Sequence, residues 1–71
     1  MTDLIYVDSS NIEAIGYDID NQQLHILFLK TGLYVYNEVP QQVFDELLAA
    51  DSKGSYFNRN IKPVYKNFEK K

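Results

Sequence analysis

The chain has 71 residues, of which 45% are hydrophobic and 14% aromatic, and its formal net charge is -3. A chain of this length forms one domain that buries only about 60% of its unfolded surface, which excludes a multi-domain machine and leaves little room for a large enzyme cleft. Because it contains no cysteine, disulfide scaffolds, thiol nucleophiles and cysteine-bound zinc or iron–sulfur sites are excluded as well.

Three β-prone segments occupy the first half of the chain. Residues 12–18 alternate between two faces, residues 24–29 are apolar on both, and residues 33–36 divide into an aliphatic face and a tyrosine face. A strand that is apolar on both faces is typical of a central position in a sheet. The short connections predict a three-stranded antiparallel meander, to which Leu4-Ile5-Tyr6-Val7 would add a fourth short strand at the N-terminal edge.

Two glycines mark special backbone positions in this meander. Lys30-Thr31-Gly32 predicts a tight hairpin in which Gly32 adopts a positive φ. Gly16 lies inside the first strand, where a glycine indicates either a β-bulge or the close approach of another side chain.

The second half of the chain predicts two helices. Pro40 suits the first helical position, and Gly54 would end that helix as a residue in the left-handed region. Between them lies an apolar stripe at helical spacing, formed by Val43, Phe44, Leu47, Leu48 and Ala50. A shorter helix over residues 55–61 would have Ser55 as its cap and would end before Pro63.

Together these elements predict an α+β fold. The three-stranded antiparallel meander, with its short N-terminal edge strand, packs against one main helix in the C-terminal half and a second short helix. Residues 1–71 form a single domain, ordered from Leu4 to Phe68 and ending in a frayed Lys70-Lys71 tail. The main helix covers one face of the sheet, and the tyrosine face is either exposed or covered by the C-terminal segment.

The charges are segregated along the sequence. Residues 1–52 contain nine acids and one base and carry -8, whereas residues 53–71 contain six bases and one acid and carry +5. The net negative charge disfavours general nucleic-acid binding, but the segregation predicts a basic patch on an acidic body. The alternative is a basic tail that is solvated or that lies against this body.

Candidate binding residues come from the tyrosine pair and the basic segment. Tyr34 and Tyr36 lie two apart on one strand, so their rings share a face on which unpaired bases can stack. Basic side chains interleaved with aromatic ones suit contacts with phosphates. We therefore predict an RNA-binding surface with both rings exposed, formed by Tyr34, Tyr36, Lys53, Arg59, Lys62 and Lys66. The alternative is that the rings pack under the C-terminal segment and the bases form a solvated face.

No arrangement of residues predicts catalysis or a metal site. His25 is the only histidine and lies in mid-strand, which indicates a partly buried side chain. Asp18-Ile19-Asp20-Asn21 is similar to the start of a calcium loop, but Gln23 and Leu29 stand where glycine and glutamate are required. Ser52-Lys53-Gly54-Ser55 would place backbone N–H groups beside an anion, although a capped turn between helices is the simpler interpretation.

The order of several short motifs resembles the KTSC domain, named for the C-terminal domain of some lysyl-tRNA synthetases and also found as a small stand-alone bacterial protein. The motifs are Ile15-Gly16-Tyr17-Asp18, Gly32 before Tyr34-Val35-Tyr36, Val39-Pro40, and Ser52-Lys53-Gly54-Ser55-Tyr56-Phe57-Asn58. The resemblance spans residues 7–65. It implies no established activity, and it suggests RNA binding through the association with a tRNA synthetase.

We predict a small non-enzymatic binding module of the KTSC type that contacts RNA through the tyrosine pair and the basic C-terminal segment. The alternative is a protein–protein interaction module or a homodimer that uses a sheet edge and binds no nucleic acid. No cofactor is predicted. The lack of a leader, and of an apolar run near the ~20 residues of a spanning helix, favours a cytoplasmic protein without membrane contact.

Overall fold

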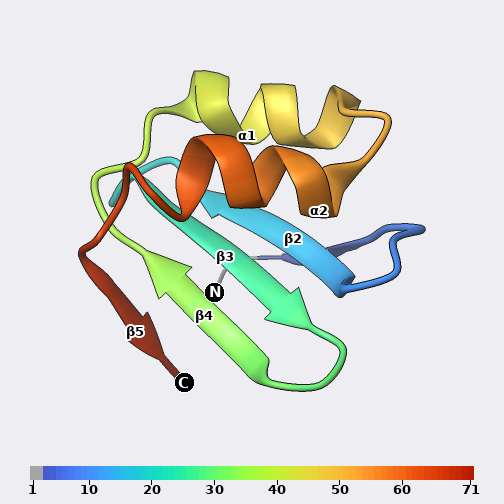
Figure 1. Ribbon diagram of the computed structural model, residues 1–71. Coiled ribbons are helices and arrows are strands. Elements are labelled where there is room, and N and C mark those ends of the chain that lie inside the picture. Colours follow the sequence, from blue (N-terminus) through green and yellow to red (C-terminus); the bar gives the residue numbers. More distant parts are fainter. Residues whose placement is uncertain (1–2) are drawn as a thin grey trace.

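The chain forms a five-stranded antiparallel sheet with its helices on one side (Figure 1). The computed structural model describes residues 3–71. In sheet order the strands are β1 (Ile5–Tyr6), β2 (Ile12–Asp18), β3 (Gln23–Phe28), β4 (Gly32–Tyr36) and β5 (Phe68–Lys70). The α+β class and the N-terminal edge strand are confirmed. The sheet has one more strand than expected, because the chain returns after the helices and adds β5 beside β4.

The helical layer consists of α1 (Gln41–Ala49), α2 (Lys53–Tyr56) and a π-helical segment, η1 (Phe57–Ile61), which continues α2. Pro40 is the N-cap of α1. Ser52 caps α2 in place of the predicted Ser55, because the Ser52 hydroxyl accepts a hydrogen bond from the Ser55 N–H at 3.4 Å. No helix among residues 3–71 is long and apolar enough to cross a membrane.

The predicted role of Gly54 as a left-handed helix stop is wrong. Gly54 lies inside α2, and α1 ends at Ala49, after which Ala50 has extended backbone. A Cβ added at Gly54 would lie 3.4 Å from the Asn11 side-chain nitrogen, an ordinary van der Waals contact, so this position does not require a glycine.

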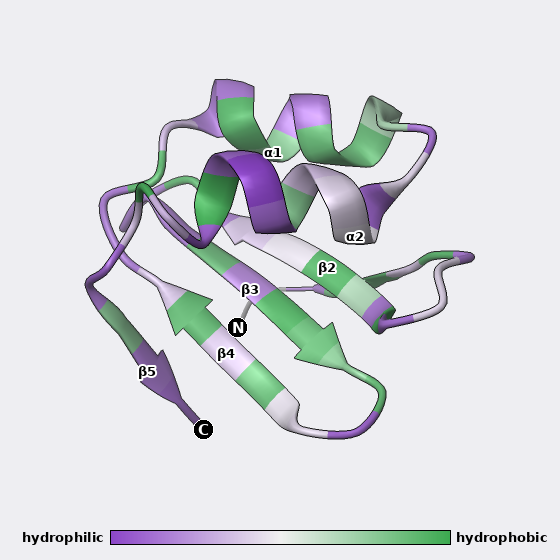
Figure 2. Ribbon diagram, viewed as in Figure 1, coloured by the Kyte–Doolittle hydropathy of each residue, from purple (hydrophilic) through white to green (hydrophobic). Residues whose placement is uncertain are grey.

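The core lies between the helical layer and the sheet. Its largest fully buried side chains are Ile12, Ile15, Leu24, Ile26, Val39, Leu47 and Ile61. Burying each such aliphatic side chain stabilises the fold by about 1.5–3 kcal/mol. The central strand β3 is mostly hydrophobic in Figure 2, whereas β5 is mostly hydrophilic. The polar composition of β5 explains why its sequence is typical of a solvated tail.

The face of the sheet that carries Tyr34 and Tyr36 is the face that the helices cover. Tyr36 is paired in register with Leu24, and Tyr34 with Ile26, and both aliphatic partners are fully buried. Since side chains alternate between the faces of a strand, rings in register with the core point inward. Tyr36 is only 4% exposed, so the prediction of two bare rings is wrong for Tyr36. Tyr34 is half-buried.

The hairpin prediction is confirmed, whereas the bulge lies elsewhere. Gly32 has a φ of +95°, the left-handed conformation predicted for the turn. The register of β2 against β3 shifts between Ile12 and Ala14 and not at Gly16, which is paired regularly with His25.

The C-terminal residues are not frayed. Lys70 lies in β5, paired with Tyr34, and the Lys71 N–H donates a hydrogen bond to the Leu33 carbonyl at 2.7 Å. The prediction of a frayed tail is wrong. The backbone N–H and C=O groups of this segment form hydrogen bonds with the free edge of β4, whereas those of a frayed tail would be bonded to water.

Candidate nucleic-acid interface

A groove of about 710 Å³ opens on the covered side of the sheet. Its aromatic lining consists of Phe28, Tyr34, Tyr36, Phe57 and Phe68. The rest of the lining consists of Lys30, Lys62 and Lys66 together with Ser10, Asn11, Leu29, Thr31 and Asn58. We refer to this surface as the aromatic groove. It is bounded by the β3–β4 hairpin, the end of the helical layer and β5.

The five rings of the aromatic groove form a closed circuit of contacts. The ring centroids are 5.3 Å apart for Phe28–Tyr34, 5.8 Å for Tyr34–Phe68, 5.0 Å for Phe68–Tyr36, 5.6 Å for Tyr36–Phe57 and 5.2 Å for Phe57–Phe28. Edge-to-face and offset stacked pairs are each worth about 0.5–1.5 kcal/mol beyond the burial of area. The circuit therefore holds the aromatic lining in defined orientations.

Four elements bring these rings together, namely β3, β4, β5 and η1. Phe28 and Tyr34 lie on the two strands of the β3–β4 hairpin, and Phe68 is paired with Tyr36 across the β4–β5 ladder. Phe57 comes from η1, where the Lys62 N–H donates to the Phe57 carbonyl at 2.9 Å, the five-residue spacing of a π-helix. The site thus depends on long-range pairing and not on one contiguous motif.

The side chains that line the aromatic groove carry positive charge only. Lys30, Lys62 and Lys66 are exposed, and no carboxylate belongs to the lining. Lysines of like sign beside an apolar surface attract anionic groups and above all phosphates. The groove therefore offers an aromatic surface with a cationic rim.

The predicted surface residues divide into two groups. Tyr34, Tyr36, Lys62 and Lys66 all line the aromatic groove. Lys53 and Arg59 do not belong to its lining. The Lys53 ammonium instead donates a hydrogen bond to the Ala50 carbonyl at 3.1 Å, at the C-terminal end of α1. Arg59 is exposed on η1.

Four aromatic or basic lining residues were missing from the predicted surface, and one of them, Phe57, lies in η1. Phe28 and Lys30 belong to the hairpin that leads into the tyrosine strand, and Phe68 belongs to β5. Hairpin pairing was predicted, so the proximity of Phe28 to Tyr34 was within reach of the sequence.

Hydrogen bonds distinguish the tyrosines of the covered side. The Tyr17 hydroxyl donates to the Val39 carbonyl, and the Tyr56 hydroxyl donates to Glu46. Within residues 3–71, the hydroxyls of Tyr34 and Tyr36 have no hydrogen-bond partner. Burial raises the pKa of Tyr36 above its ordinary value, and the neighbouring Tyr34 adds to this effect.

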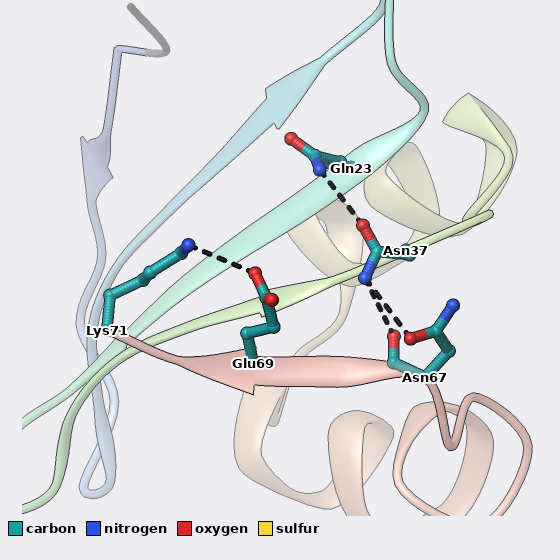
Figure 3. Close-up of polar contacts among 5 residues, drawn as sticks. All are labelled: Gln23, Asn37, Asn67, Glu69 and Lys71. Atoms are coloured by element: carbon teal, nitrogen blue, oxygen red, sulfur yellow. Dashed lines mark hydrogen bonds and ion pairs between the residues drawn. The ribbon is translucent and has the colours of Figure 1, made fainter.

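A row of amides holds β5 against β4 on the opposite face of the sheet (Figure 3). The Gln23 side-chain amide donates to the Asn37 side-chain oxygen at 2.9 Å, and the Asn37 amide nitrogen lies 3.3 Å from the Asn67 carbonyl. The Asn37 backbone N–H also donates to that carbonyl, at 2.9 Å. Beyond them, Glu69 and Lys71 form an ion pair of 3.0 Å. The amide contacts and the Asn37 backbone hydrogen bond position the strand that carries Phe68, whereas the exposed ion pair joins two residues of the same segment.

The other sites considered in the sequence have structural explanations. His25 lies opposite Gly16 and Val35, and burial lowers the pKa of its imidazole, an effect that Asp18 opposes and Lys71 reinforces. No group of three or more acidic or histidine side chains among the described residues is arranged to hold a metal. At the start of α2 the Ser52 hydroxyl accepts a hydrogen bond from the Ser55 N–H, as in a capped turn, so this N–H is not free to bind an anion.

Comparison with known proteins places these residues in a family. The family model of the KTSC domain matches residues 8–65. A protein of Tsukamurella paurometabola is 48% identical over 60 residues, which cover 84% of this chain and 90% of that protein. An uncharacterized protein of Stutzerimonas stutzeri is 39% identical over 61 residues, 86% of each chain.

Two further comparisons concern a larger protein and a solved structure. A lysine–tRNA ligase of a Nostoc species is 38% identical over 63 residues, which are 89% of this chain but 11% of the ligase. The crystal structure of a KTSC domain protein from Yersinia pestis has a TM-score of 0.96 and 37% identity, covering 100% of this chain and 99% of that chain. Since both the family model and these relatives match most of its length, the chain belongs to the KTSC domain family.

Proposed function

We propose that this KTSC domain binds single-stranded RNA in the aromatic groove. The observation that carries the proposal is the presence of five aromatic rings and three lysines, with no carboxylate, in one groove. Unpaired bases stack on aromatic side chains at about 1–3 kcal/mol per base, and lysines neutralise the adjacent phosphates. The similarity to a segment of a lysine–tRNA ligase supports the proposal, because tRNA is a substrate of that enzyme.

The positive charge at the rim of the groove decides between a cationic ligand and one that carries a phosphate. A set of aromatic rings also suits a cationic group, which is attracted to the faces of the rings. Lys30, Lys62 and Lys66 repel such a group and attract a phosphate. A nucleotide combines the flat apolar ring and the negative charge that this groove favours.

We infer binding without catalysis. The lining of the aromatic groove contains neither a histidine nor a carboxylate, the groups that most often transfer protons in active sites.

A titration of labelled single-stranded RNA at low salt tests the proposal. In a Lys62→Ala plus Lys66→Ala variant we expect binding to weaken and its dependence on salt to become shallower, since fewer counterions are released. The matched control is Lys53→Ala plus Arg59→Ala, which removes the same charge outside the groove lining. Equal losses in both variants, or no binding by the wild type, would contradict binding in the groove.

Sheet-edge pairing is a second candidate function. Strands β1 and β5 are the two edges of the sheet, and β1 exposes Ile5 and Tyr6, the latter at 70%. An exposed edge can accept a strand from another chain. Light scattering after size-exclusion chromatography tests self-association, and a Tyr6→Lys variant should convert any dimer formed through β1 to a monomer.

A further inference from the structure

The aromatic groove contains two tyrosine hydroxyls, those of Tyr34 and Tyr36, that form no hydrogen bond with another group of residues 3–71. Buried tyrosine hydroxyls normally find a partner. Here the less deeply buried hydroxyls of Tyr17 and Tyr56 are both hydrogen-bonded. Tyr36 is almost completely buried, yet its hydroxyl has no partner within residues 3–71 and is not among the fully enclosed, unpaired polar atoms. Its hydroxyl therefore retains contact with solvent where Tyr36 lines the groove.

The two tyrosines that carry these hydroxyls lie on the same side of the groove. Both tyrosines project from the same face of β4, two residues apart, and each ring contacts the ring of Phe68. Each hydroxyl is both a donor and an acceptor. A ligand in the groove thus meets apolar ring surface and, beside it, a pair of hydrogen-bonding groups.

The charge and size of the groove restrict what can use this pair. A volume of about 710 Å³ lies inside the range of small-molecule sites. Lys62 and Lys66 supply positive charge at the rim, and the Asn58 amide adds a further donor and acceptor to the lining. A ligand that fits these features has a flat ring, polar atoms on the edge of that ring, and an attached phosphate.

From these features we propose that the aromatic groove binds one unpaired nucleotide, whose base lies against the partly exposed rings of Phe28, Tyr34 and Phe68 and directs its polar edge to the hydroxyls of Tyr34 and Tyr36, while Lys62 and Lys66 contact its phosphate. This proposal rests on the proposed function and specifies which part of the ligand is recognised. The nucleotide is either part of an RNA strand or free in solution, and the chemistry of the contact is the same in both.

Phenylalanine substitutions test the role of the hydroxyls without removing the rings. Tyr34→Phe and Tyr36→Phe should each weaken the binding of a short single-stranded RNA by roughly fivefold, since each removes one hydrogen bond. Tyr6→Phe removes a hydroxyl from exposed β1, outside the groove, and should leave the affinity unchanged. Thermal unfolding of each variant verifies that it is folded. The salt dependence should stay at its wild-type slope because the lysines are intact.

Two further ligands complete the test. An abasic oligonucleotide keeps the phosphates but lacks the base, and we expect it to bind much more weakly than the intact strand. Nucleoside monophosphates, titrated alone, distinguish the two sources of the ligand: binding as tight as that of the strand assigns the groove to free nucleotides.

The outcomes separate this inference from the proposed function. If RNA binding depends on Lys62 and Lys66 but is unchanged in the two phenylalanine variants or with the abasic strand, the RNA function stands and recognition of the base is overturned. If neither RNA nor mononucleotides bind, both proposals fail.

Discussion

Phe68 stacks on Tyr36, with ring centroids 5.0 Å apart and ring planes at 28°. Tyr36 is the last residue of β4, and Phe68 is the first residue of β5 and is paired with it. This contact attaches the C-terminal strand to the aromatic circuit and makes β5 a wall of the aromatic groove. The end of the chain is therefore part of the candidate site.

Replacement of Phe68 by alanine should reduce stability, mainly because the contacts between aromatic rings are lost and only to a small extent because apolar surface is exposed. Phe68 is 45% exposed, and the substitution removes its contacts with Tyr36 and Tyr34. We expect the free energy of unfolding to fall by about 1–3 kcal/mol, as measured by urea denaturation. Val64→Ala is the control, since Val64 is 62% exposed and its loss should cost less than about 0.5 kcal/mol. Equal effects of the two changes would show that the stacking contributes nothing.

The amide row on the opposite face should determine how firmly β5 is held. Asn37→Ala removes the side-chain hydrogen bonds to Gln23 and Asn67, so we expect a loss of about 1–2 kcal/mol in the free energy of unfolding. Exchange of the Lys71 N–H, which is bonded to the Leu33 carbonyl, should become faster than in the wild type. Gln42→Ala breaks only an exposed bond to Glu46 and is the control. Unchanged exchange at Lys71 in Asn37→Ala would contradict this role.

The two glycines of the hairpin and of α2 should respond differently to alanine. Gly32 has a φ of +95°, so Gly32→Ala should cost about 1–2 kcal/mol although no atom lies within 4 Å of the added Cβ. Gly54 has helical backbone, and its added Cβ would meet the movable Asn11 amide at 3.4 Å. Alanine has a higher helix propensity than glycine by about 1 kcal/mol, so Gly54→Ala should leave the free energy of unfolding unchanged or raise it. Thermal unfolding of both variants compares their stabilities. A larger loss of stability in Gly54→Ala than in Gly32→Ala would contradict the prediction.

The bond between Tyr56 and Glu46 should make stability depend on pH at the alkaline end. The Tyr56 hydroxyl donates to the Glu46 carboxylate at 2.6 Å, and this bond raises the pKa of Tyr56 to about 12. Because the neutral phenol is the donor, the contribution is complete below the ordinary pKa of about 10 and is lost as the pH rises through about 12. A difference titration by ultraviolet absorbance should show a tyrosine with this high pKa in the wild type and not in Tyr56→Phe.

The same pair has an effect of opposite sign in acid. The hydrogen bond from Tyr56, with a second from Gln42, lowers the pKa of Glu46. The contribution of Glu46 is therefore complete above its ordinary pKa and is lost as the pH falls through the lowered value. In Tyr56→Phe, an NMR titration should find the pKa of Glu46 closer to its ordinary value. A titration identical to that of the wild type would contradict the assignment.

Much of the architecture could be predicted because it depends on neighbours in sequence. The turn at Gly32 needs one residue with positive φ, and the stripe that includes Leu47 needs only helical spacing. The tyrosine pair and two of the four predicted bases belong to the aromatic groove. Lys53 and Arg59 were included because they lie near the others in sequence, although the turns of α2 and η1 direct them elsewhere.

The sequence by itself determined the fold class, the hairpins, the helices and the family, because these follow from local periodicity, turn chemistry and motif order. Only the tertiary structure decided that Tyr36 points inward and that a polar tail becomes β5. Both depend on which face of the sheet the helices cover and on which edge of β4 is free. Residues far apart in the chain satisfy these conditions together, so no single segment contains the information.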